Sequence, residues 1–429
     1  MVFDLKDPKF WDEEALFKEM YRIFDICNGC RLCYNLCPSF EFLFKKIDET
    51  DNLDDLTKED YYKVVDLCYD CKLCFPKCPY VPPHHYELDF PRLMLRAKAV
   101  KVKKEGIPIR DKILGQADLI GKLGSKFSTL INFANSFKPS RVLMEKILGI
   151  HRERNLPKYH SETFDKWFKK FSKQNGTKKE EKKAKVVLFY TCTVNYNEPE
   201  IGKAVVKVLE HNDIEVIVPE QKCCGMPFLD GGDIDSAIKN AKFNVKSLVN
   251  YVKQGYDIVI PAPTCGYMFK QEYTMLLPDD EDAKLVSQHT YDISEYLMKL
   301  HREGKLKTDF KNPQGKIIYH LPCHLKAQNI GYKSKELLEL IPGTEVEMIQ
   351  RCSGHDGTWS MKKEYFEMSM KVGKPIFDRI NQSDDVQFVV SSDCSLAQLQ
   401  IEKGTGKKGL HPIQILYNAY GLNENQKQN

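Results

Sequence analysis

Residues 27–38 have the sequence CNGCRLCYNLCP and residues 68–79 have the sequence CYDCKLCFPKCP, so both have the spacing Cys-x2-Cys-x2-Cys-x3-Cys-Pro. Each cysteine of the second motif follows its counterpart in the first by 41 residues. In this spacing three close cysteines hold three irons of a cubic cluster, and the cysteine before the proline holds an iron of the other cluster. The motifs predict two [4Fe-4S] clusters, and their predicted ligands are Cys27, Cys30, Cys33, Cys37, Cys68, Cys71, Cys74 and Cys78.

Two other uses of these cysteines are less compatible with the sequence. Four thiolates also suit zinc, but zinc sites use separated Cys-x2-Cys pairs and seldom three cysteines at this step. The first twenty residues are acidic and contain no apolar signal segment, so we expect no export and no disulfide framework. No run approaches the ~18 apolar residues of a membrane-spanning helix. The fifteen cysteines therefore predict reduced, metal-binding thiols in the cytoplasm.

The net charge of +4 conceals an uneven distribution of charged residues. Residues 1–90 contain 11 lysines and arginines against 19 acidic residues, a net −8, whereas residues 91–185 contain 25 against 9, a net +16. A basic middle segment indicates contact with an anionic surface, such as phospholipid, or with an acidic partner. The alternative is a solvated linker, because much of the excess lies in the run 169–185. The sequence leaves both interpretations open.

Residues 91–170 have a helical pattern throughout, beginning near Pro91, which suits the first turn of a helix. Six apolar residues within this segment alternate at steps of three and four and predict a narrow seam on one helix: Ile120, Leu123, Phe127, Leu130, Ala134 and Phe137. We expect the seam to pack in the core, with docking on a membrane surface as the alternative. Gly176 and the lysine- and glutamate-rich run to Lys185 form the predicted linker.

From residue 186 onward, short β-branched runs alternate with helical segments, which is typical of a parallel α/β sheet. We expect a helix from about Asp233 to Gln254, ended by Gly255. Three predicted strands, 186–190, 215–218 and 258–260, each precede a cysteine. The strands 317–319, 345–349 and 388–390 repeat this arrangement. The second and third of these cysteine positions are 42 residues apart in both halves, from Cys223 to Cys265 and from Cys352 to Cys394. The sequence therefore predicts two copies of one domain, copy one at 186–310 and copy two at 311–421.

The predicted fold class is α + α/β, with a helical ferredoxin-like domain followed by two repeated domains with parallel sheets. The expected divisions are a di-cluster domain at 1–90, a basic helical connector and linker at 91–185, copy one, copy two and a polar tail at 422–429.

The remaining seven cysteines all follow predicted strands. Because the carboxyl ends of parallel strands meet at one sheet edge, where ligands bind, cysteines far apart in sequence can meet there. Such a meeting predicts a metal centre or a redox-active thiol site; the alternative is that they are small buried hydrophobic residues. The candidates are Cys192, Cys223, Cys224 and Cys265 in copy one, and Cys323, Cys352 and Cys394 in copy two.

The stretch Cys223-Cys224-Gly225-Met226-Pro227, with Cys192 upstream and Cys265 downstream, resembles the cysteine-rich CCG domain. That domain occurs in the B subunit of heterodisulfide reductase and in iron–sulfur subunits of glycolate and lactate oxidases. Joined to two ferredoxin motifs, the arrangement is most similar to the C subunit of anaerobic glycerol-3-phosphate dehydrogenase. The resemblance covers essentially the whole chain and implies an electron-transfer subunit.

The chain departs from the family's five-cysteine pattern in both copies. Ala262 replaces one cysteine of copy one, and the four that remain suffice for an ordinary iron–sulfur cluster or another metal. Ser353 and Ser391 replace two cysteines of copy two, so three cysteines remain and a cluster there would need a ligand from outside this set. His324 or His355 could supply it. Otherwise copy two is a degenerate copy with a structural or partner-docking role.

No Gly-x-Gly-x2-Gly opens a helix after a strand, and no phosphate-binding loop is present, so we expect neither flavin nor NAD in this chain. The resemblance then implies a flavoprotein dehydrogenase partner that delivers electrons, and quinone or another acceptor at the cytoplasmic face of the membrane. The chain has no assigned catalytic residue. The alternatives are a heterodisulfide reductase-like thiol–disulfide reductase and the iron–sulfur subunit of a lactate or glycolate oxidase. A nucleic-acid partner is not expected, because no basic platform with interleaved aromatic residues is present.

Overall fold

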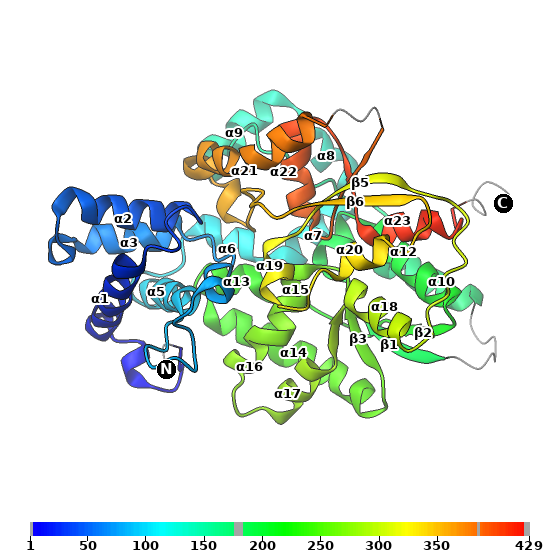
Figure 1. Cartoon of the computed structure of the whole chain (residues 1–429), viewed down its shortest axis with the longest axis horizontal. Coiled ribbons are helices and arrows are strands. Elements are labelled where there is room, and N and C mark those ends of the chain that lie inside the picture. Colours follow the sequence, from blue (N-terminus) through cyan, green and yellow to red (C-terminus); the bar gives the residue numbers. More distant parts are fainter. Residues whose placement is uncertain (1–2, 176–182, 384–386, 424–429) are drawn as a thin grey trace. The chain divides into compact units, whose positions relative to one another are not determined.

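The computed structural model describes residues 3–175, 183–383 and 387–423; most of the predicted linker and polar tail lie outside these ranges. The chain forms two compact units. Unit 1 contains Met1–Gln116, Gly225–Ile238 and Asp356–Trp359, and unit 2 contains Ala117–Cys224, Lys239–His355 and Ser360–Asn429. The five-part division expected from the sequence stays a prediction. Figure 1 labels the helices and strands.

Unit 1 is helical, as its sequence predicts. Proline begins two of its helices, since Pro38 follows Cys37 directly and Pro91 lies in the first turn after the capping residue Asp89. The helices of unit 1 pack their apolar faces into one core, which contains residues such as Phe24, Phe44 and Val65, and the motif cysteines contact this core. The elements are η1 (Pro8–Phe10), α1 (Glu13–Cys30), α2 (Pro38–Thr50), η2 (Leu53–Asp55), α3 (Lys58–Leu67), α4 (Cys74–Lys77), α5 (Phe90–Glu105), α6 (Ile109–Gly115) and α13 (Met226–Asp230).

Copy one contains a parallel four-stranded sheet in the order β2-β1-β3-β4. The strands are β1 (Ala184–Leu188), β2 (Ile214–Ile217), β3 (Asp257–Ile260) and β4 (Thr290–Asp292), of which β4 was not predicted. The helices are α11 (Cys192–Tyr196), α12 (Pro199–His211), α14 (Ile234–Lys253), α15 (Pro263–Tyr267), α16 (Tyr273–Leu276), α17 (Glu281–Gln288) and α18 (Ile293–Arg302), with a π-helical turn η3 (Met268–Glu272). The predicted limits of α14 are confirmed, because the Asp233 side chain accepts from the Ser236 N–H and Gly255 has a φ of 84°.

Copy two repeats this topology with the parallel order β6-β5-β7-β8. Its strands are β5 (Gly315–His320), β6 (Thr344–Ile349), β7 (Val389–Ser392) and β8 (Gly409–Leu410). Its helices are α19 (Cys323–Ala327), α20 (Lys333–Leu338), α21 (Phe366–Asn381), α22 (Ser395–Thr405) and α23 (Pro412–Ala419), with single turns η4 (Trp359–Met361) and η5 (Lys363–Tyr365). One hydrophobic core contains residues of both copies, among them Val205, Ile317 and Leu416. The predicted α + α/β class with two repeated parallel sheets is confirmed.

The connector is helical only in part. Its helices in unit 2 are α7 (Ala117–Lys126), α8 (Ser128–Ser136), α9 (Lys138–Leu148) and α10 (Phe164–Asn175), and residues 149–163 contain no helix. The predicted seam is divided between α7, α8 and the residues beside them, and four of its large side chains are exposed; Leu130 is 67% exposed. The expectation that the seam packs in the core is therefore wrong. Among the helices that the structure describes, none has the length and apolar content needed to cross a bilayer.

Candidate iron–sulfur and thiol centres

The first ferredoxin motif gathers its three close cysteines with the last cysteine of the second motif. Helix α1 ends at Cys30, and Arg31 turns the chain with a left-handed φ of 51°. A small cavity beside Leu32 and Phe44 is lined by all four cysteines of this group, which are Cys27, Cys30, Cys33 and Cys78. Burial raises the pKa of the Cys33 thiol to about 11. All four are partly exposed, so this group lies near the surface of unit 1.

The second motif makes the reciprocal arrangement. A small cavity is lined by Cys68, Cys71 and Cys74 together with Cys37 of the first motif. The three cysteines of the close triplet are buried, unlike those of the first motif. Asp70 and Lys72 in this loop have left-handed φ values of 55° and 64°. The exchange of the fourth cysteine between motifs is the geometry that the spacing predicts, while the assignment of these eight cysteines as ligands stays a prediction.

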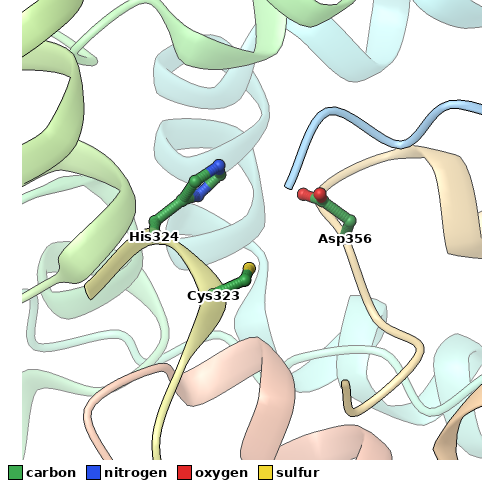
Figure 2. A group of neighbouring side chains, drawn as sticks. All are labelled: Cys323, His324 and Asp356. Atoms are coloured by element: carbon green, nitrogen blue, oxygen red, sulfur yellow. The ribbon is translucent and has the colours of Figure 1, made fainter. Parts of the chain in front are cut away.

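A buried group of charges that the sequence analysis missed lies beside the second motif in unit 1. Lys72 Nζ is 2.7 Å from Asp70 Oδ2, with both side chains 1% exposed, and Lys98 Nζ donates to the Cys68 carbonyl at 3.2 Å. Burial and the neighbouring Asp70 raise the pKa of Asp230 well above its ordinary value. The same two causes raise the pKa of Asp356, which is labelled in Figure 2. Residues from three distant segments meet here, so no local pattern could have identified the group.

In copy one, the four predicted cysteines meet at the carboxyl edge of the sheet. Their thiols form a hydrogen-bonded chain in which Cys192 donates to Cys223, Cys223 to Cys224, and Cys224 to Cys265. Cys192 begins α11 after β1, Cys223 follows β2, and Cys265 lies in α15 after β3. The parallel strands thus bring together sulfur atoms that are up to 73 positions apart in the sequence.

Buried polar groups hold the backbone of this centre in place. The Cys223 N–H donates to Asp118 Oδ2 at 2.7 Å, and the Cys223 carbonyl accepts from Asn240 Nδ2 at 3.0 Å. The Cys224 carbonyl accepts from the Tyr273 hydroxyl at 3.0 Å. Thr191, directly before Cys192, has a φ of 71°, which a β-branched residue rarely adopts. Such strain is typical of functional sites. Asp118 was missed by sequence reasoning because it lies 105 residues before Cys223.

The donor set of copy one fits a metal centre. The hydrogen bond that Cys192 donates to Cys223, together with burial, raises the pKa of Cys192 well above its ordinary value. The hydrogen bond that Cys224 accepts from Cys223 lowers its pKa, but donation to Cys265 and burial together raise that pKa well above its ordinary value. Thiols must lose their protons to bind iron or zinc, and a bound cation stabilises the thiolates that burial disfavours. Four sulfur ligands suit an iron–sulfur cluster or zinc.

Copy two places Cys323, Cys352 and Cys394 after β5, β6 and β7, which are neighbours in its sheet. Figure 2 shows Cys323 and His324 side by side at the start of α19, and their ligand atoms lie within 4.8 Å of each other. The His324 ring has partners in copy one, because Nδ1 is 2.9 Å from Thr264 Oγ1 and the ring stacks on Tyr267.

His355 has a different environment. The residue is 7% exposed, and among the described residues neither ring nitrogen has a hydrogen-bond partner. Ser391 Oγ, at a position where the family has a cysteine, is likewise buried without a partner among the described residues. Burial and the neighbouring Arg154 lower the pKa of His355 to about 3. Both ring nitrogens of His355 are therefore available to a ligand, while a ring nitrogen of His324 lies within 4.8 Å of the Cys323 sulfur.

The loop that contains Ala262 touches copy two. His411 Nε2 donates to the Pro261 carbonyl at 3.1 Å, and Gln328 Nε2 donates to the Pro263 carbonyl at 3.0 Å. The hydrogen bond that Cys265 accepts from Cys224 lowers the pKa of Cys265, whereas burial and the nearby thiols, Cys394 of copy two among them, raise it above its ordinary value. The copies therefore meet at the loop in which copy one has lost a cysteine.

Comparison with protein families identifies both kinds of domain. The model described as the citrate utilization protein B Fer4-like domain matches residues 20–104. The model described as the cysteine-rich CCG domain matches twice, at residues 186–270 and 317–400. The predicted repeat is confirmed, and these domains indicate that the chain carries iron–sulfur clusters.

Several curated proteins are similar over long stretches. The C subunit of anaerobic glycerol-3-phosphate dehydrogenase from Escherichia coli (strain K12) is 33% identical over 314 residues, covering 72% of this chain and 77% of that protein. Lactate utilization protein A of Bacillus pumilus (strain SAFR-032) is 28% identical over 250 residues, covering 56% of this chain and 99% of that protein. The B subunit of fumarate reductase (CoM/CoB) from Methanothermobacter marburgensis is 29% identical over 240 residues, covering 54% of this chain and 45% of that protein.

Proposed function

The chain belongs to the family of the anaerobic glycerol-3-phosphate dehydrogenase C subunit, and we propose that it relays electrons between a flavoprotein dehydrogenase and a membrane acceptor. In this proposal two [4Fe-4S] clusters pass electrons to a third centre at Cys192, Cys223, Cys224 and Cys265, and from there to quinone or another acceptor. The observation that carries the proposal is the hydrogen-bonded chain of four thiols in copy one, three of them buried, in a protein that also gathers two complete ferredoxin-type groups.

The two ferredoxin groups differ in exposure, which supports a direction for the relay. The first group is partly exposed, and the triplet of the second is buried. Because electron transfer weakens steeply with distance, a partner's cofactor must approach an exposed cluster, and we assign that role to the group of Cys27, Cys30, Cys33 and Cys78. The clusters supply one-electron chemistry, and the protein sets their potentials through burial, nearby charge and hydrogen bonds.

The residues of the chain hold and tune these centres. Lys72 and Lys98 place positive charge at the Cys68 loop, which favours the reduced, more negative state of a cluster there. Asp118 and Asn240 fix the Cys223 backbone, so its sulfur has a defined position toward the other three. Neither role requires an organic cofactor in this chain.

A second candidate function is thiol–disulfide reduction at copy one. The similarity to the B subunit of a fumarate reductase (CoM/CoB) and the adjacency of four thiols favour it. Ala262 weakens it, because one position of the five-cysteine pattern has no sulfur.

The decisive experiment combines anaerobically purified protein with flavoprotein subunits of the glycerol-3-phosphate dehydrogenase type. Adding glycerol 3-phosphate should reduce the clusters, as followed by EPR, and a quinone analogue should reoxidise them. Unchanged EPR signals would reject this assignment of the partner. Turnover of a small disulfide by the dithionite-reduced protein alone would instead support the second candidate. Iron and sulfide analysis counts the centres, since about eight irons correspond to the cubane pair alone.

A further inference from the structure

Three consecutive helices of unit 2 present large apolar side chains to solvent. Helices α7, α8 and α9, with the residues that connect them, expose eight of these side chains to between 48% and 69%, and α8 has no buried residue at all. Helix α8 contacts both α7 and α9, so these side chains come from neighbouring helices, and exposed apolar surface of this kind marks a binding site. We call these residues the apolar face; they are Leu119, Leu123, Phe127, Leu130, Phe133, Phe137, Leu143 and Ile147.

Packing on the opposite side of α7 explains why these side chains face outward. The buried residues of α7 are Gly121, Gly124 and Ser125, so its smallest side chains face the protein. A Cβ atom on Gly121 would lie 2.1 Å from the Tyr196 ring, and one on Gly124 would lie 2.4 Å from the Tyr159 ring. No large side chain fits there, so the helix cannot turn its leucines inward. The exposure of the apolar face is built into the packing.

The exposed charges that helices α7, α8 and α9 themselves carry all have the same sign. Within residues 117–148 the exposed charged residues are four lysines, Lys122, Lys126, Lys138 and Lys146. Both acidic residues of the segment are engaged with the protein, since Asp118 accepts from the Cys223 N–H and the 8%-exposed Glu145 pairs with Arg152. The remaining cation, Arg141, is buried and donates to backbone carbonyls. These three helices therefore expose apolar side chains together with positive charge and no acidic side chain.

We propose that the apolar face docks on the surface of an anionic phospholipid bilayer. Helices of this kind lie in the interface with apolar side chains among the acyl chains, while lysines reach the lipid phosphates. Attraction to anionic headgroups adds to the apolar contribution. A protein partner would meet four lysines without one exposed acid to set the register of ion pairs, and a second copy would bring lysine against lysine. The charge pattern therefore favours lipid.

This inference rests on the proposed function, because it names the surface through which the chain would reach a membrane acceptor. Helix α7 presents Leu119 and Leu123 to solvent and directs Asp118 toward the Cys223 loop. One helix thus connects the docking surface with the thiol centre of copy one. A lipid-soluble electron acceptor would meet the protein on the side where this helix lies.

The test is flotation of the full, anaerobically purified chain with lipid vesicles. Vesicles of phosphatidylcholine and phosphatidylglycerol in equal parts should bind the chain at least about tenfold more tightly than phosphatidylcholine alone, and salt should weaken the binding. The variant Leu130→Glu with Phe133→Glu should lose about tenfold or more, and it should fold normally because both side chains are exposed. Tyr332→Glu, at an exposed aromatic residue elsewhere in unit 2, should bind as the parent does.

A second pair of variants tests the role of charge. Lys122→Glu with Lys126→Glu should abolish the preference for phosphatidylglycerol, whereas Lys242→Glu with Lys246→Glu, at exposed positions with the same spacing on α14, should preserve it. The proposal is overturned if the parent does not bind the anionic vesicles or binds both kinds equally. It is also overturned if the α8 variant only converts a dimer into a monomer, which would assign the face to a second copy. Reduction by the flavoprotein with a soluble dye as acceptor is measured in parallel, so a failure of docking and a failure of the relay are distinguishable.

Discussion

Copy one and copy two share a strand order and a cysteine after each of three strands, yet they present different donor sets. Copy one joins four thiols in a hydrogen-bonded chain, whereas copy two has Ser353 and Ser391 where the family pattern has cysteines. The backbone of the central loop is alike in both, because Gly225 and Gly354 have φ values of 99° and 74°. The loop conformation therefore persists in copy two although two of its sulfur donors are absent.

The largest expected effect comes from removing a thiol of copy one. Cys223→Ser should eliminate the centre of copy one and stop electron delivery to the acceptor, because Cys223 lies inside the sulfur chain and contacts two other thiols. EPR and iron analysis measure the result. The matched variant Cys352→Ser, at the same loop position of copy two, should leave that signal intact. Equal iron loss in both variants would show that the two copies are functionally equivalent.

The next effect concerns the buried imidazole of copy two. His355→Ala should remove most of any metal held by copy two, because its two ring nitrogens have no other partner among the described residues. Metal analysis in a Cys223→Ser background isolates this contribution. His324→Ala is the control and should have the smaller effect, since His324 already has partners in Thr264 and Tyr267. Unchanged metal content in His355→Ala would assign the residue a structural role.

A backbone test examines the shared loop conformation. Gly354→Ala should destabilise the protein by about 3 kcal/mol, because it forces a side chain into a left-handed conformation and against packed backbone. The added Cβ would lie 1.9 Å from the Ser369 carbonyl oxygen. Gly406→Ala is the matched control, with a φ of 72° and no atom within 4 Å of an added Cβ, and should cost only about 1 kcal/mol. Urea unfolding measures both, and equal losses would mean that the loop relaxes around the new side chain.

The smallest expected effect is a difference between the two copies in how their contribution to folding stability depends on pH. Asp292 is the last residue of β4, His411 directly follows β8, and each forms a capping box on the next helix. Burial and the nearby Asp393 raise the pKa of Asp292, while burial lowers the pKa of His411 to about 3. Both side chains are therefore uncharged in the folded protein near neutral pH.

The two shifts change stability in opposite directions as the pH varies. The folded state keeps the Asp292 proton that the unfolded state releases above its ordinary pKa of about 4, so stability falls as pH rises above that value. The unfolded state protonates His411 below about pH 6.5, so stability falls as pH decreases from there toward 3. Asp292→Asn should flatten the loss of stability that accompanies a rise from about pH 4 to about pH 8. His411→Gln should flatten the loss that accompanies a fall from about pH 6.5 to about pH 3, and each change should be roughly 1 kcal/mol. Identical pH profiles for the parent and both variants would contradict this assignment.

Much of the fold could be predicted because its signals are local. The three long strands of each copy contain runs of β-branched residues, and the ends of α14 follow from Asp233 and Gly255. The edge strands β4 and β8 were missed because they have three and two residues and no such run. Asp118 was missed because only the folded chain brings α7 to the Cys223 loop.

The sequence by itself determined which residues can donate sulfur and at which ends of which strands they lie. The spacing of cysteines within a loop and after a strand is a local property, so it survives without knowledge of the fold. Only the tertiary structure decided that the seam of α7 and α8 faces solvent, because helical periodicity shows that apolar residues share a face but not what that face meets. Gly121 and Gly124 turned that face outward by fitting the space beside Tyr196 and Tyr159.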